Sequence, residues 1–100
     1  SDEYRETISY DGIVPDHDYA VIVNGDSMLP LFEDKQIIFV KKRTDIRSGQ
    51  IVIANYDQQA YVKKFVSDDS GARFVSLNKK YDDMPINANH ETSIFGVVVL

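Results

Sequence analysis

The stretch "QIVIANYDQQAYVKKFV", residues 50–66, is the segment that best defines the fold. Its two arms, residues 50–56 and 59–66, are rich in β-branched and aromatic side chains, which are typical of β-strands. A polar pair, Asp57 and Gln58, separates the arms, and two residues are the length of a tight hairpin turn. The stretch therefore predicts an antiparallel hairpin.

Short apolar runs on both sides of this hairpin predict further strands. The runs are "DYAVIV", "KQIIFVKK", "RFVSLN" and "SIFGVVVL", and polar segments, including the long loop "KKYDDMPINAN", separate them. Gly96, inside the last run, indicates a bulge or a close backbone contact. No helical period continues for the length of an ordinary helix, although "DSMLPLFED" can hold one helical turn opened by Asp26 or Ser27. The predicted fold class is mainly β.

The size and composition are those of one small globular domain, with 100 residues, 43% hydrophobic and 27% charged. The chain contains no cysteine, which excludes disulfides and thiolate metal sites. No apolar run reaches the roughly 20 residues that span a bilayer, and the start has no signal-peptide pattern. We therefore expect a cytoplasmic protein with no membrane partner.

The charge distribution argues against direct nucleic-acid binding by this chain. The formal net charge is −5, and residues 1–34 carry nine acidic side chains against the single base Arg5. The rest of the chain carries only +3, which is too weak a field to hold a phosphate backbone. The short cluster Lys41, Lys42 and Arg43 is best explained as a solvated strand end.

Histidine-based chemistry has little support. His17 and His90 are the only histidines, and neither shows the spacing of metal ligands. A serine–histidine–aspartate site would need one of them beside Ser27, and no nucleophile-elbow motif is present. The chain also has no glycine-rich phosphate loop, so we predict no metal and no cofactor.

Ser27 lies in "VNGDSMLP", residues 23–30, a polar kink between two apolar runs. It is a turn residue, a helix cap or a nucleophile, depending on whether the chain supplies a base. A lysine can deprotonate a serine when burial lowers the lysine pKa, because desolvation disfavours the ammonium form. The hairpin arm "QAYVKKFV" offers two candidates, Lys63 and Lys64.

Alternation along the strand does not choose between these lysines. Lys63 shares a face with Tyr61 and Phe65, and the opposite face, with Lys64, is also partly apolar. At least one lysine therefore lies against a hydrophobic wall. The alternative is that one lysine extends its charged end to water along that wall and the other is fully solvated.

Four blocks, in order, resemble the C-terminal domain of LexA, of similar phage repressors and of UmuD-type proteins, the S24 peptidase family. In that family a Gly-x-Ser-Met motif carries the nucleophile, and it matches "GDSM" at residues 25–28. The family's base is the lysine of a Val-Lys-Arg/Lys-Leu strand, and it matches "VKKF", which selects Lys63, 36 residues after Ser27. The blocks "FVSLNKKYDDMPI" and "SIFGVVV" also agree, so the resemblance covers roughly residues 12–100.

The resemblance implies a compact, strongly bent β-structure with short helical turns, and a serine–lysine dyad. Lys63, neutral when buried, would take the proton of Ser27, which would attack a peptide carbonyl. The backbone N–H groups of Ser27 and Met28 would hold the oxyanion. On this basis residues 12–100 are expected to be a self-cleavage and dimerisation domain, and residues 1–11 an N-terminal arm or linker remnant.

The family's usual substrate is the protein itself, cut at an Ala-Gly or Cys-Gly bond in a linker before this domain. This chain contains no Ala-Gly dipeptide and no helix-turn-helix pattern. We therefore expect the cleaved bond and a DNA-binding domain to lie outside this chain, with DNA a partner only through that domain.

The resemblance also implies partners. It predicts a homodimer, and the candidate interface residues in the apolar last strand, which are alternatively core residues, are Ile94, Phe95, Val97, Val98 and Val99. The trigger of cleavage would be a RecA filament in members of the SOS response, or an antirepressor in prophage members.

Three other functions stay open. A type I signal peptidase uses a similar dyad but needs a membrane anchor, and none precedes Ser27. The domain is alternatively a non-cleaving oligomerisation module of a phage repressor. A UmuD-like polymerase accessory protein would carry a short arm in place of the DNA-binding domain.

Overall fold

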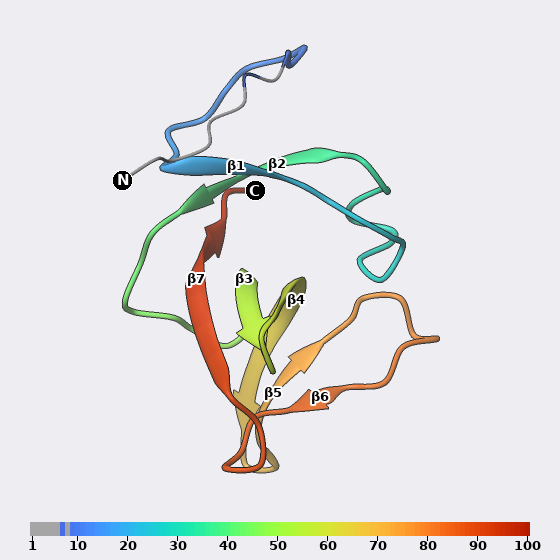
Figure 1. The fold of residues 1–100 in the computed structure, drawn as a ribbon, viewed down its shortest axis with the longest axis vertical. Coiled ribbons are helices and arrows are strands. Elements are labelled where there is room, and N and C mark those ends of the chain that lie inside the picture. Colours follow the sequence, from blue (N-terminus) through green and yellow to red (C-terminus); the bar gives the residue numbers. More distant parts are fainter. Residues whose placement is uncertain (1–6, 8) are drawn as a thin grey trace.

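The computed structural model describes residue 7 and residues 9–100, which form one antiparallel sheet in the order β1-β2-β7-β3-β4-β5-β6 (Figure 1). The strands are β1 (Tyr19–Ile22), β2 (Ile37–Lys41), β3 (Ile51–Tyr56), β4 (Gln59–Asp68), β5 (Gly71–Val75), β6 (Met84–Pro85) and β7 (Thr92–Val98). The described residues contain no helix, so the predicted mainly β class is confirmed. The predicted N-terminal arm falls largely on residues 1–6 and 8, which lie outside the described part.

The predicted hairpin is β3 and β4. Asp57 and Gln58 connect the strands with φ of 49° and 71°, and Tyr56 pairs with Gln59 across the turn. Positive φ at both central residues is the left-handed geometry that suits the twist of a two-residue hairpin. β3 is buried along almost its whole length, which explains its continuous apolar run.

Side chains on the two faces of β3 pack in two different hydrophobic cores. Ile51 and Ile53 belong to a cluster that also contains Met28 and Phe32, together with Ile38 and Val40 of β2. Val52 and Ala54, pointing the other way, belong to a second cluster with Tyr56 and Phe74. The hairpin therefore lies at the centre of the molecule, between both cores.

The final strand, β7, is inserted between β2 and β3 and pairs antiparallel with both. Figure 1 shows β1 and β2 crossing the top of the view while β3, β4 and β7 run down it, so the sheet bends strongly along β7. Gly96 lies opposite Ile53, whereas Ile94 lies opposite Ala54, which leaves Phe95 as the extra residue of a bulge.

Gly96 is also a point of close approach. A Cβ atom at this position would lie 2.6 Å from Cγ1 of Val40 and 2.7 Å from the backbone oxygen of Lys41. The bulge and the close contact that the sequence predicted as alternatives are thus both confirmed.

The structure adds detail to two predicted segments, the long polar loop and the helical turn. The predicted loop "KKYDDMPINAN" contains β6, in which Met84 pairs with Phe74, and its proline lies on the edge of the sheet, where a missing N–H is tolerated. The predicted helical turn is present, because the N–H of Phe32 donates to the oxygen of Met28 at 3.1 Å. No helix in the described part of the chain is long and apolar enough to cross a membrane.

The substitution Gly96→Ala is expected to lower the free energy of unfolding by about 1–3 kcal/mol, because the added methyl group meets backbone and a buried side chain. Urea denaturation followed by circular dichroism measures the loss. Ser93→Ala, at an exposed position of the same strand, is the control and should change stability by no more than about 0.5 kcal/mol. Equal midpoints for the Gly96→Ala variant and the unsubstituted protein would contradict the close contact.

Candidate active site

Ser27 is presented by a short loop that follows β1. Gly25 has φ of 92°, which a residue with a side chain rarely adopts, and its N–H donates to Oδ1 of Asp34 at 2.7 Å. Met28, the residue after Ser27, is 1% exposed and packs in the first core. A left-handed turn on one side and a buried anchor on the other hold Ser27 at the surface, where its side chain is partly exposed.

A second loop, residues 77–82, holds the backbone around Ser27. The N–H of Asn78 donates to the oxygen of Ser27 at 2.9 Å, and its side-chain Nδ2 donates to the oxygen of Asp26 at 3.0 Å. The Asp26 carboxylate accepts hydrogen bonds from Lys80 Nζ, at 2.8 Å, and from the hydroxyl of Tyr81. The Asp26 side chain, considered from the sequence as the start of a helical turn, instead joins the two loops.

The electrostatics of this junction follow from its hydrogen bonds. The bonds from Lys80 and Tyr81 lower the pKa of Asp26, and the same carboxylate raises the pKa of Lys80 and of Tyr81. Asp26 is therefore ionised at neutral pH, and the junction is a charged one.

Lys63 is the buried lysine of the pair on β4. Its side chain faces inward and the residue is 5% exposed, whereas Lys64 is partly exposed. Burial lowers the pKa of Lys63 because the ammonium form loses its hydration. Alternation in the sequence left the choice between the two lysines open, and burial now distinguishes them.

The surroundings of Lys63 Nζ are polar on one side and aromatic on two others. Nζ donates a hydrogen bond to Oγ of Ser76 at 2.8 Å, and Ser76 is itself 2% exposed. The ring centroids of Tyr61 and Tyr81 lie 5.5 Å and 5.7 Å from Nζ. Among the described residues, no hydrogen bond joins Nζ to Oγ of Ser27.

Ser27 and Lys63 line the same surface cavity, of about 440 Å³, together with Tyr61, Ser76 and Tyr81. A smaller cavity of about 160 Å³ adjoins Ser27 on another side and is lined mainly by apolar side chains of β1, β3 and β4. Ser27 thus lies where an apolar recess meets the cavity that contains the lysine.

The backbone amides of Ser27 and Met28 lie next to the Ser27 hydroxyl in the chain. In residues 7 and 9–100, no backbone carbonyl accepts a hydrogen bond from either amide. Two such N–H groups beside a serine hydroxyl are suited to stabilise negative charge that develops on a carbonyl oxygen.

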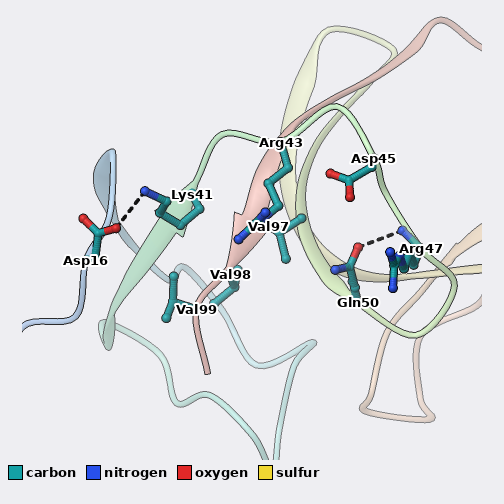
Figure 2. A pocket seen from close by; sticks show the side chains of 9 residues that line it. All are labelled: Asp16, Lys41, Arg43, Asp45, Arg47, Gln50, Val97, Val98 and Val99. Atoms are coloured by element: carbon teal, nitrogen blue, oxygen red, sulfur yellow. Dashed lines mark hydrogen bonds and ion pairs between the residues drawn. The ribbon is translucent and has the colours of Figure 1, made fainter.

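Figure 2 shows another cavity, of about 530 Å³, between the β2–β3 connection and the end of β7. Its lining mixes charges of both signs, and Lys41 is paired there with Asp16 at 3.0 Å. It shares no lining residue with the two cavities beside Ser27. Of the three residues predicted to form a solvated strand end, Lys42 and Arg43 are exposed, whereas Lys41 is only partly exposed.

Both histidines make local structural contacts. His90 Nδ1 lies 2.8 Å from Oδ2 of Asp57, and its ring stacks on Tyr56 with centroids 4.7 Å apart. His17 Nδ1 lies 2.8 Å from the backbone oxygen of Pro15. Neither histidine lines the cavities beside Ser27.

The candidate interface residues differ in exposure. Val98 is 4% exposed and belongs to the first core, while Ile94 and Val97 pack against the second. Phe95, displaced by the bulge, is 52% exposed, and Val99 is partly buried. A separate apolar surface groove near the last residues is lined by, among others, Tyr10, Ile13, Leu31, Phe39, Val99 and Leu100.

Sequence reasoning missed Ser76 and Asn78. A signal for Ser76 was present in the turn "DDSG", because that turn sets the register in which Lys64 pairs with Val75. The next pair in the same register is Lys63 with Ser76, on one face of the sheet. Asn78 contacts a segment about 50 positions away along the chain, and no local pattern indicates such a contact.

Comparison with known proteins identifies the class. The chain matches the Peptidase S24-like family over residues 1–99, and it therefore belongs to that family. It is 31% identical to the LexA repressor of a Marinomonas species over 77% of this chain and 38% of the relative. It is 34% identical to the LexA repressor of Carboxydothermus hydrogenoformans over 81% of this chain and 40% of the relative.

A third relative, the LexA repressor of Caldicellulosiruptor saccharolyticus, is 30% identical over 93% of this chain and 45% of the relative. The identification as a LexA-like S24 domain is confirmed by the family match and by these relatives. The chain spans about two fifths of the length of these relatives.

The Lys63 amine is expected to titrate below the usual lysine value of about 10.4. NMR of protein labelled with ¹³C at lysine Cε follows each lysine with pH, and Lys63→Met assigns the resonance by its loss. In denaturing urea the same resonance should return to about 10.4, because hydration is restored. A Lys63 resonance that titrates alike in folded and unfolded protein would contradict its desolvation.

The same shift predicts a pH-dependent stability. Between the lowered pKa of Lys63 and about 10.4, the unfolded chain binds more protons than the folded chain, so the free energy of unfolding rises with pH. Lys63→Met should remove this rise, measured by urea denaturation at several alkaline pH values. An unchanged slope in the variant would assign the rise to other groups.

The bond between Asp26 and Tyr81 predicts that Asp26→Asn lowers the pKa of Tyr81 toward its ordinary value. Tyrosine absorbance or ring NMR, assigned with Tyr81→Phe, measures the change. Tyr56, whose pKa is raised mainly by burial, is the internal control and should not move. If the pKa of Tyr81 is the same in the Asp26→Asn variant and the unsubstituted protein, the two loops are not joined by this hydrogen bond.

Proposed function

We propose that this chain is the self-cleavage and dimerisation domain of a LexA-like or prophage transcriptional repressor, an intramolecular serine endopeptidase. The observation that carries the proposal is that Ser27 and the buried Lys63 line one cavity. Membership of the S24 peptidase family and the LexA repressors among its relatives support it. Residues 12–100 form the domain in this proposal, and residues 1–11 are an arm or linker remnant.

In the proposed reaction Lys63 is the general base and Ser27 the nucleophile. Neutral Nζ takes the hydroxyl proton of Ser27 as Oγ bonds to the carbonyl carbon of the substrate peptide. The carbonyl oxygen becomes an oxyanion, which the N–H groups of Ser27 and Met28 stabilise. The C–N bond then breaks, and the leaving amine takes the proton from Lys63, which leaves an ester on Ser27.

Water completes the reaction. Lys63, neutral again, accepts a proton from water as its oxygen attacks the ester, and the C–Oγ bond breaks to return the proton to Ser27. The products are a new carboxylic acid and a new amine. Burial lowers the pKa of Lys63, so the neutral amine that this step requires is available at a lower pH than for an exposed lysine.

The substrate in this proposal is a bond of the parent protein, in a linker N-terminal to this domain and outside this chain. The small apolar cavity beside Ser27, of about 160 Å³, suits a small aliphatic side chain such as alanine on the acyl side of the bond.

The proposed partners follow from the repressor function. The domain pairs with a second copy through the last strand, where Phe95 offers the half-exposed aromatic side chain. DNA is bound only by an N-terminal domain outside this chain, and a RecA filament or an antirepressor triggers cleavage. In this proposal the protein acts in the cytoplasm.

One observation favours a second candidate, a non-cleaving oligomerisation module. Lys63 Nζ is bonded to Ser76, and no hydrogen bond to Ser27 is formed among the described residues. In a module that never cuts itself, this arrangement would simply satisfy a buried amine.

Incubation of the full-length parent protein at alkaline pH separates the two candidates, because lysine deprotonation should start self-cleavage. The unsubstituted protein should yield two fragments, and Ser27→Ala and Lys63→Met should each reduce the rate by at least about 10³-fold. Ser93→Ala, outside both cavities, is the control. Mass spectrometry of the fragments identifies the bond, and cleavage that survives Ser27→Ala would reject the dyad.

A further inference from the structure

We propose that Ser76 is a positioning residue, whose hydroxyl holds the Lys63 amine so that the nitrogen lone pair is directed into the cavity lined by Ser27. This inference rests on the proposed function. It concerns a residue outside the two motifs that contain Ser27 and Lys63.

The geometry fixes Ser76 beside the amine. β4 and β5 pair so that Ser76 follows Val75, the partner of Lys64, and lies across from Lys63. Nζ and Oγ are 2.8 Å apart, and the two residues are 5% and 2% exposed. Because both groups are removed from bulk water, this hydrogen bond is not in rapid exchange with solvent bonds.

The hydrogen bond between Lys63 and Ser76 can orient the lone pair of a neutral amine. A neutral lysine has two N–H donors and one lone pair, and only the lone pair can accept the Ser27 proton. When one N–H donates to Ser76 Oγ, rotation about the Cε–Nζ bond is restricted and the lone pair stays available. A serine hydroxyl accepts such a bond readily, whereas an alanine at position 76 would leave the amine free to rotate.

The groups around Nζ determine how loss of the Ser76 hydroxyl would change the pKa of Lys63. Tyr61, from β4, and Tyr81, from the 77–82 loop, present their rings to Nζ and favour the ammonium form. Asp26 is bonded to Tyr81, and Asp82 lines the same cavity. Ser76 also favours the ammonium form, because a charged donor makes the stronger hydrogen bond.

Ser76→Ala is therefore expected to change two quantities, the pKa of Lys63 and the rate of self-cleavage. The Lys63 pKa should fall further, because desolvation stays and one stabilising hydrogen bond is lost. The rate of self-cleavage at high pH, where Lys63 is fully neutral, should nevertheless fall by about 10- to 100-fold, because the base is no longer oriented. A merely structural role predicts no downward shift of the pH midpoint.

The experiment measures the pH–rate profile of self-cleavage in the full-length parent protein for the Ser76→Ala and Ser76→Thr variants. The expected result is a lower plateau and a lower midpoint for alanine, and recovery of both by threonine, which retains the hydroxyl. Thermal unfolding of each variant checks that the fold is retained. A plateau that is unchanged or raised by Ser76→Ala overturns the inference, since a raised plateau would mean that Ser76 competes with Ser27 for the amine.

A titration of Lys63 by ¹³C NMR in this chain separates this inference from the proposed function, because it requires no cleavage. Ser76→Ala should shift the Lys63 midpoint to lower pH, and Ser76→Thr should restore it. If the parent protein never cuts itself, the proposed function fails, and the titration alone decides whether Ser76 governs the amine. If Ser76→Ala leaves the titration midpoint of Lys63 unchanged, the inference is overturned, whether or not cleavage occurs.

Discussion

The burial of one lysine amine is the constraint on which the site depends. Lys63 lies in β4 between two neighbouring strands, with its Nζ removed from water and bonded to Ser76. A buried ammonium is costly, so the protein environment favours the neutral form that can act as a base. Burial in the sheet therefore lowers the pKa of Lys63, and the rings of Tyr61 and Tyr81 oppose this shift by favouring the charged form.

Presentation of the serine depends on a different set of contacts. Met28, which packs in the first core, anchors the loop around Ser27. Asn78 also holds this loop, because it donates hydrogen bonds to the backbone oxygens of Asp26 and Ser27. Lys63 is thus placed by the sheet and Ser27 by two loops.

Much of the fold could be predicted because its signals are local. The turn at Asp57 and Gln58 and the β-branched arms around it predict the hairpin, and Gly96 within an apolar run predicts the bulge. The choice between Lys63 and Lys64 could not be made from alternation, because both faces of β4 are partly apolar. Resemblance to a family made that choice, and burial in the structure agrees with it.

By itself the sequence determined most of the strands and the turn of the central hairpin, because these depend on residues close together along the chain. The pairing of β4 with β5, and with it the place of Ser76 beside Lys63, came from the structure. Only the tertiary structure decided that β7 enters between β2 and β3, and that the 77–82 loop binds the loop of Ser27. These contacts join residues 36 to 58 positions apart, where side-chain packing and hydrogen-bond geometry, and not local periodicity, select the partner.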